Sequence, residues 1–295
     1  MSFEEFTNYI RDHITDGWNE SASVSIQKIK KNNGIVYTGA YIRSEGSMVT
    51  PAIYLEAYYE RLQEGETPEE LLVDIRKEFD WAMSRTSSFE FDISSYANVR
   101  DRLIYRLINY EKNKELLMAC PHIRLEDLAV TFRWLAHEDS VGISTALVTY
   151  NELELWEVTV QDILLAAREN TERIFPRKVM YIEDFFMERN MNVLHDERSI
   201  PMFVATNQQQ INGASVILYD HFLEDFAGEH PGNYYILPSS IHELILIPED
   251  SIQDPDSLCD IVAHANSTVV SDGDILSDSV YYYNADSNSL SIYKR

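Results

Sequence analysis

The chain has 295 residues, of which 45% are hydrophobic and 12% aromatic, so it is too apolar for a disordered protein. The formal net charge is −25, and residues 199–293 contain 14 Asp or Glu but no Lys or Arg. Contacts to phosphates need Lys and Arg, so this charge disfavours direct binding to nucleic acid and to anionic membranes.

Two cysteines, Cys120 and Cys259, do not make a disulfide framework in a chain of this length. No window is long and apolar enough for a transmembrane helix, and the acidic start lacks the features of a signal peptide. No glycine-rich phosphate loop is present, so we expect no cofactor. These features predict a cytoplasmic protein whose acidic surface maintains solubility or attracts a basic protein partner.

The first elements form a helix and a hairpin. Residues 3–14 carry apolar side chains at helical spacing, which predicts an amphipathic helix. Asn33-Gly34 is typical of a type I′ turn, because both central positions of that turn need a positive φ. We therefore expect a hairpin with strands at 23–30 and 35–43.

Two helices should follow the hairpin. Residues 53–63 predict the first. Thr67 is a suitable cap for the second, with Pro68 in its first turn and Glu70 at the position of a capping box, and this helix should extend to residue 84.

Residues 99–109 are compatible with a helix but favour a strand. In a strand, Arg100, Arg102 and Arg106 alternate and face the same side. They would form the one basic cluster able to hold an anion, although pairing with nearby acids is the more common outcome. A short helix is expected at 114–119.

The middle of the chain predicts two strands and three helices. Residues 125–136 and 142–150 are β-rich runs that should be antiparallel neighbours. Asn151 is expected to cap a short helix, and Thr159 is expected to cap the next one. Residues 178–189 predict a third helix.

The last third centres on two apolar runs, Tyr234–Leu237 and Leu244–Pro248, which are apolar on both faces and therefore belong inside a sheet. The other expected elements are strands at 202–207, 214–219, 280–284 and 289–293, and helices at 220–230 and 254–269. The second helix should turn Leu258, Ile261, Val262 and Ala265 inward.

This order repeats strand, strand and helix, which predicts an α+β fold of antiparallel sheets with helices packed on them. We expect two regions, 1–150 and an acidic 151–295, and the alternative is one continuous domain.

One candidate site for chemistry is the connection between the two central strands. His242-Glu243 begins like a helical zinc motif, but Leu246 stands where the second histidine belongs. Ser240 places a hydroxyl near the imidazole. His242, Glu243 and Ser240 are therefore weak catalytic candidates, and turn chemistry is the simpler interpretation.

The helix at 220–230 begins with Asp220, His221, Glu224 and Asp225. His221 is a weak candidate metal ligand together with one of these acids, but a solvated acidic face explains the group equally well, so no metal site is expected. The carboxylates are candidate binding residues.

Cys120 lies next to Pro121-His122. A cysteine and a histidine can form a catalytic dyad, but adjacency in sequence is not the required geometry. A buried structural cysteine is the more common case, and the same holds for Cys259.

Tyrosines 234, 235, 281 and 283 are further candidate binding residues, because tyrosine combines apolar area with a polar tip. Partly buried strand positions are the alternative, since tyrosine also favours strands.

Several segments together carry a family resemblance: LINYEKNKELL, EDLAVTFRWL, ARENTERIFP, NGASVILYDHFLEDF and YYILPSSIHELILIPED. The chain resembles a domain-of-unknown-function family of anaerobic Gram-positive gut bacteria over most of its length. The resemblance implies a single architecture and brings no activity, substrate or catalytic residue with it.

These features favour a non-enzymatic protein that binds another protein through an acidic, Tyr-rich C-terminal surface. One alternative is an acidic mimic of nucleic acid that inhibits a nuclease or a defence system. The other is a hydrolase with a His-centred site, built on His242 or near His221.

Overall fold

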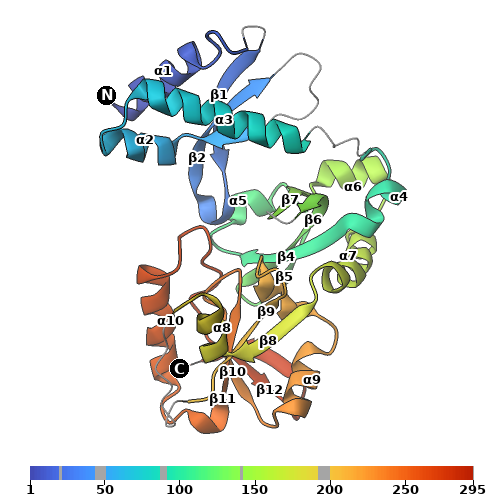
Figure 1. The fold of residues 1–295 in the computed structure, drawn as a ribbon. Helices are drawn as coiled ribbons and strands as arrows, with labels where there is room; N and C mark the ends of the chain where they lie inside the picture. Colours follow the sequence, from blue (N-terminus) through green and yellow to red (C-terminus); the bar gives the residue numbers. More distant parts are fainter. Residues whose placement is uncertain (20–21, 44–50, 87–91, 140–141, 192–199, 295) are drawn as a thin grey trace. The chain divides into compact units, whose positions relative to one another are not determined.

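The computed structural model describes residues 1–19, 22–43, 51–86, 92–139, 142–191 and 200–294. Contacts divide the chain into an N-terminal unit, Met1–Phe91, and a C-terminal unit, Asp92–Arg295 (Figure 1). This division differs from the one expected at residue 150, because strands from residues 103–147 belong to the C-terminal unit. The fold is α+β with three antiparallel sheets. No described helix has the length and apolar character needed to cross a membrane.

The N-terminal unit packs helices on a three-stranded sheet. The strands are β1 (Ser23–Lys30), β2 (Val36–Arg43) and β3 (Ala52–Tyr54), and the helices are α1 (Phe3–His13), η1 (Asn32–Gly34), α2 (Glu56–Gln63) and α3 (Pro68–Thr86). Asn33 and Gly34 both have positive φ, as the hairpin turn requires. Thr67 and Glu70 form the expected capping box of α3. The expected helix at 53–63 is wrong at its start, where β3 pairs with β2.

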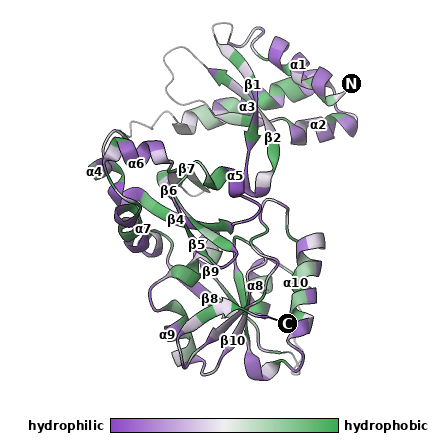
Figure 2. Ribbon diagram, turned by 180° about the vertical axis from the view of Figure 1, so that it is seen from behind, coloured by the Kyte–Doolittle hydropathy of each residue, from purple (hydrophilic) through white to green (hydrophobic). Residues whose placement is uncertain are grey.

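The first sheet of the C-terminal unit has the strand order β4-β6-β5, and β7 also pairs with β6. Its strands are β4 (Leu103–Asn109), β5 (His122–Leu125), β6 (Leu128–Asp139) and β7 (Gly142–Leu147). The helices of this part are α4 (Tyr96–Val99), η2 (Arg100–Arg102), α5 (Lys114–Leu117), α6 (Tyr150–Trp156) and α7 (Val160–Ile174). Figure 2 shows hydrophobic residues concentrated on the strands and hydrophilic ones on outward parts of helices such as α7.

Two sequence-based expectations fail in this part. Arg100 and Arg102 lie in η2 before the strand begins, so the basic row with Arg106 does not form. Thr149, and not Asn151, caps α6, because its side chain accepts from the N–H of Asn151 while Glu152 completes the capping box. The Thr159 cap of α7 is confirmed.

The second sheet has six strands in the order β13-β12-β10-β11-β9-β8. They are β8 (Arg177–Tyr181), β9 (Phe203–Asn207), β10 (Tyr234–Leu237), β11 (Leu244–Pro248), β12 (Tyr281–Asn284) and β13 (Ser289–Ile292). The helices are α8 (Ile182–Glu188), η3 (Gly213–Leu218), α9 (Phe222–Glu229), η4 (Glu249–Ser251) and α10 (Asp256–Thr268). The central position of β10 and β11 is therefore confirmed.

The two faces of this sheet are covered by different helices. On one face, Leu258 and Val262 of α10 pack against a buried cluster with Tyr235 and Ile247. On the other face, Phe226 of α9 contacts the rings of neighbouring strands. Ile261 is 54% exposed, so its expected inward position is wrong. α10 instead buries Asn266, whose amide bonds to the carbonyl oxygen of Ser277 at 2.9 Å.

The expected strand at 214–219 is wrong, because the segment forms the 3-10 helix η3. A Cβ on Gly213 would lie 2.0 Å from Oγ1 of Thr206 and 2.4 Å from the carbonyl oxygen of His242. Only glycine permits this approach of the chain to β9. The Ser215 hydroxyl then accepts from the N–H of Leu107 at 3.2 Å, which ties η3 to β4 of the other sheet.

The expected helix at 178–189 is also wrong in its first part. Residues 177–181 form β8, which pairs antiparallel with β9, and α8 begins only at Ile182. This strand is one edge of the six-stranded sheet, and the groove described next lies beside it.

Candidate functional site

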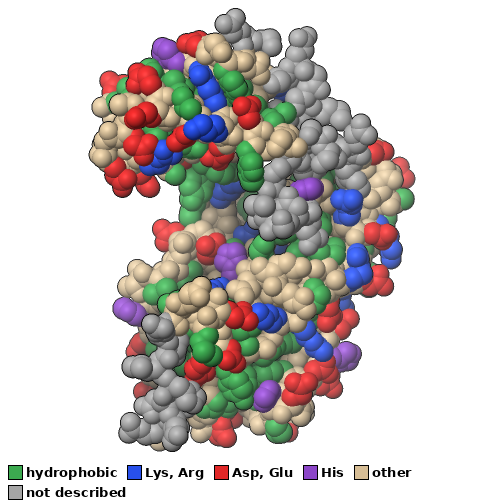
Figure 3. All heavy atoms as spheres, viewed as in Figure 1, with side chains coloured by type: hydrophobic (Ala, Val, Ile, Leu, Met, Phe, Trp, Pro, Cys, Tyr) green, Lys and Arg blue, Asp and Glu red, His purple; other side chains and the backbone are tan. Residues whose placement is uncertain are grey.

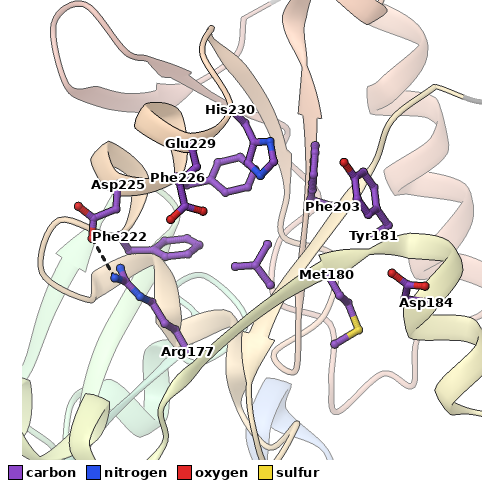
Figure 4. A pocket seen from close by; sticks show the side chains of 11 residues that line it. Arg177, Met180, Tyr181, Asp184, Phe203, Phe222, Asp225, Phe226, Glu229 and His230 are labelled. Atoms are coloured by element: carbon purple, nitrogen blue, oxygen red, sulfur yellow. Dashed lines mark hydrogen bonds and ion pairs between the residues drawn. The ribbon is translucent and has the colours of Figure 1, made fainter.

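A groove of about 450 Å³ lies between the edge strand β8 and helix α9 (Figure 4). Its lining comes from β8, α8, β9 and α9: Arg177, Val179, Met180, Tyr181, Asp184, Phe203, Phe222, Asp225, Phe226, Glu229 and His230. Figure 3 shows hydrophobic side chains gathered over this part of the surface. We refer to this feature as the β8 groove.

The floor of the β8 groove is aromatic. Phe203 of β9 lies at its centre, with ring centroids 4.8 Å from Tyr181, 5.2 Å from Phe226 and 4.6 Å from His230. The Phe226 and His230 rings are 5.0 Å apart, so the cluster is continuous. The negative faces of such rings attract cations.

The rim of the β8 groove carries charge. Arg177 and Asp225 form an ion pair at 2.9 Å, drawn as a dashed line in Figure 4. Asp184 and Glu229 are exposed, and among the described residues neither has a cationic partner within ion-pair distance. The rim therefore has two carboxylates available to a ligand.

Among the described residues, no strand pairs with the outer side of β8. The N–H of Ile182 donates to Met202 and the N–H of Gln208 donates to Pro176, so the even-numbered residues of β8 bond to β9. Antiparallel pairing alternates, and Val179 and Tyr181 therefore direct their N–H and C=O groups away from the sheet. Their side chains, 37% and 50% exposed, line the groove.

The acidic start of α9 is less negative than its sequence suggests. His221 bonds to Glu224 at 2.9 Å, and this hydrogen bond raises the pKa of the imidazole.

Four cations from residues 112–189 pair with acids of the C-terminal third: Lys112 with Asp278, Arg168 with Asp220, Arg177 with Asp225 and Arg189 with Glu243. The acidic surface expected from residues 199–293 is therefore partly neutralised, because the fold brings these cations alongside.

The candidate tyrosines are core residues. Tyr234, Tyr235, Tyr281 and Tyr283 are at most 4% exposed. The expected Tyr-rich surface is wrong, since both faces of β10 and β12 are covered. Tyr234 takes part indirectly, because its ring lies 4.9 Å from that of Phe226 beneath the floor of the β8 groove.

The catalytic candidates lie together in a second, open hollow of about 390 Å³, lined by Ser240, His242, Glu243 and Asp274 among others. Nδ1 of His242 accepts from the N–H of Asn212 at 3.2 Å, and Nε2 lies 3.5 Å from Asp274. The Ser240 hydroxyl accepts from the backbone N–H of His242 at 3.0 Å. Both imidazole nitrogens are thus occupied away from the hydroxyl, and a base must contact its nucleophile.

The cysteines do not form a nucleophilic site. Cys120 is fully buried, and burial raises the pKa of its thiol to about 11. Nδ1 of His122 contacts the carbonyl oxygen of Cys120 at 3.0 Å and not the sulfur. Cys259 packs against the α10 cluster. Among the described residues, no group of three or more His, Cys, Asp or Glu could hold a metal ion.

Sequence reasoning missed most of the β8 groove. Of its lining, only Asp225 was a candidate. The signal was present in the segment RKVMY, where residues alternate between more and less exposed positions as an edge strand requires. The expected helix at 178–189 obscured that alternation.

Fold and site together define an α+β protein with an open sheet edge beside an aromatic, acid-rimmed groove. The chain belongs to DUF5688, a family of unknown function, which matches residues 3–285. No curated protein and no solved structure matches the chain.

Proposed function

We propose that this protein binds another protein by accepting an extended, basic segment along β8, with a Lys or Arg side chain inserted into the β8 groove. The observation that carries the proposal is an outward-facing edge strand whose exposed side chains line an aromatic hollow with two unpaired carboxylates. The proposal keeps the protein-binding role expected from the sequence and moves it from the buried tyrosines to this edge.

Backbone pairing supplies the first part of the interaction. An added strand forms main-chain hydrogen bonds with the outward N–H and C=O groups of Val179 and Tyr181. The alternate side chains of such a segment point toward the same face as those of Val179 and Tyr181. One of them therefore reaches the floor formed by Phe203 and Phe226.

Charge supplies the second part. A Lys or Arg in the groove meets aromatic faces and the carboxylates of Asp184 and Glu229. Cation–π contact contributes about 0.5–2 kcal/mol, depending on how far the cation is desolvated. The net charge of −25 adds long-range attraction for a basic partner.

The two alternatives receive less support. A nucleic-acid mimic needs a continuous row of free carboxylates, whereas acidic and basic side chains are interspersed on the face of the C-terminal unit drawn in Figure 3. A hydrolase at His242 needs a bond between the imidazole and a nucleophile, whereas the Ser240 hydroxyl accepts from the backbone N–H of His242 and Nδ1 of the ring accepts from Asn212. A cytoplasmic location and an origin in anaerobic Gram-positive gut bacteria stay predictions.

The test is selection of displayed random peptides, long enough to span β8, on the wild-type protein. A double variant, Asp184→Asn with Glu229→Gln, removes the free charge of the rim and leaves the aromatic floor intact. The matched control is Asp254→Asn with Asp286→Asn, which removes two exposed acids that do not line the groove.

We expect selected peptides to be enriched in Lys or Arg at alternating positions. We also expect them to bind the rim variant at least about tenfold more weakly, and the control as well as wild type. Peptides without basic residues, equal binding to the rim variant, or no enrichment would contradict the proposal.

A further inference from the structure

Two arginines meet inside the C-terminal unit, away from the β8 groove. Arg106 lies on β4 and Arg133 on β6, where Arg106 pairs with Thr131 and Arg133 with Ile104. This register makes the arginines diagonal neighbours on one face of the sheet, a separation that long side chains span. Two guanidinium groups therefore share one small region.

Among the residues that the structure describes, none pairs with the guanidinium group of Arg106. Its Nε is buried without a hydrogen bond. Arg133 donates from Nε to Oγ1 of Thr145 at 2.7 Å and from Nη2 to the carbonyl oxygen of Thr145 at 3.1 Å. Neither arginine has a carboxylate within ion-pair distance among the described residues.

The cavity between these arginines is also free of acids. It is lined by Arg106 and Arg133 together with neutral groups that include Thr145, Asn212 and Ser215, and no Asp or Glu is among the described lining residues. The charge of Asp274 acts on Arg106, but Asp274 lies 3.5 Å from Nε2 of His242 and forms no ion pair with the arginine.

Both arginines remain cations at neutral pH. Burial, with repulsion from Arg133 as a smaller cause, lowers the pKa of Arg106 to about 10. Burial also lowers the pKa of Arg133. An arginine with a buried, unbonded Nε is costly, and the second guanidinium beside it adds repulsion, so the site calls for an anion that the described part of the chain does not supply.

We propose that a single monatomic anion of the size of chloride binds between the guanidinium groups of Arg106 and Arg133. The cavity holds about 10 Å³, which is room for about one water-sized sphere and too little for a phosphate or a sulfate. The free N–H groups of Arg106 and the second terminal nitrogen of Arg133 donate to the ion. The amide of Asn212 is a further donor in the lining.

The first test compares thermal unfolding in chloride and in gluconate, a bulky anion, at constant ionic strength. We expect Tm to rise with chloride along a saturable curve, because an ion that binds only the folded state stabilises it by mass action. Arg106→Gln should lose this dependence. Arg100→Gln, a change at an exposed arginine, should keep it.

The stability of Arg106→Gln relative to wild type in gluconate alone is a further part of this test. Without chloride, Arg106→Gln should be at least as stable as wild type, because the substitution removes an uncompensated charge. As chloride is added, the Tm of wild type should rise relative to that of the variant. Sulfate and phosphate stabilise folded proteins in general, so their effect should be equal in both proteins. A rise of Tm in phosphate or sulfate that is present in wild type and absent in Arg106→Gln would overturn the monatomic assignment.

The second test does not depend on a variant that folds. Crystals of the wild-type protein grown or soaked in bromide should give an anomalous peak between Arg106 and Arg133. The absence of this peak, or a chloride dependence of Tm that is equal in wild type and Arg106→Gln, would overturn the proposal.

Discussion

At the scale of single residues, Asp127 joins the two sheets of the C-terminal unit. It lies in the turn between β5 and β6, and its carboxylate accepts from the hydroxyls of Ser277 at 2.6 Å, Ser279 at 2.9 Å and Tyr281. The three donors lie 150 to 154 residues after Asp127 in the sequence. Nothing in the local sequence identifies Asp127, because its partners become neighbours only in the folded chain.

Replacing Asp127 with Asn should destabilise the protein by about 1–3 kcal/mol, because a partly buried charge-assisted network loses an acceptor. Urea unfolding followed by circular dichroism measures this change. Asp286→Asn, at an exposed acid of the last hairpin turn, is the control and should change stability by less than about 0.5 kcal/mol. Equal stability of the two variants would show that the network contributes little.

Ion pairs illustrate the limit of sequence reasoning at this scale. Residues 199–293 contain no Lys or Arg, yet Arg168 and Arg177 reach Asp220 and Asp225 across 52 and 48 residues. Composition gave the net charge correctly but could not give its distribution, because distribution depends on which strands become neighbours.

At the scale of elements, local signals predicted most helices and the central strands. Capping boxes at Thr67 and Thr159 fix helix starts through bonds within one turn. The apolar runs of β10 and β11 indicate a strand pair covered on both faces. By contrast, η3 follows from the long-range contact of Gly213 with His242, and β8 is short and half-exposed, so neither was predicted.

The open edge of β8 leads to a prediction about proline. Val179→Pro removes an N–H that points away from β9, so it should leave the sheet intact and change stability by less than about 1 kcal/mol. It should weaken binding of the selected basic peptides at least about tenfold, because a main-chain hydrogen bond of the added strand is lost. Fluorescence anisotropy with a labelled peptide measures this loss.

Lys178→Pro is the matched control for that change. Its N–H faces β9, so the substitution breaks a bond within the sheet and should lower stability by about 1–3 kcal/mol. If Val179→Pro destabilises the protein as much as Lys178→Pro does, the outward direction of the Val179 backbone is wrong.

At the scale of the whole molecule, buried tyrosines predict a loss of stability in alkali. Burial is the largest cause of the raised pKa of Tyr105, Tyr219 and Tyr281. Above about pH 10 the unfolded chain therefore holds fewer protons than the folded one, and the free energy of unfolding falls as pH rises. Below that pH the contribution of these groups is fully present.

Each such tyrosine should contribute a slope of about 1.4 kcal/mol per pH unit above the unfolded pKa. Tyr105→Phe should make the alkaline loss shallower by about this amount, and Tyr150→Phe, at a residue 49% exposed, should not. Urea unfolding at a series of pH values measures the slopes. Equal slopes in both variants would show that Tyr105 ionises normally in the folded state.

The central claim is that β8 receives an added strand, and amide hydrogen exchange tests it most directly. In the free protein the amides of Val179 and Tyr181 should exchange fast and those of Lys178 and Met180 slowly, because only the latter donate within the sheet. With the selected basic peptide bound, exchange at Val179 and Tyr181 should slow at least about tenfold. Peptide binding that leaves exchange at these two amides unchanged would contradict the account.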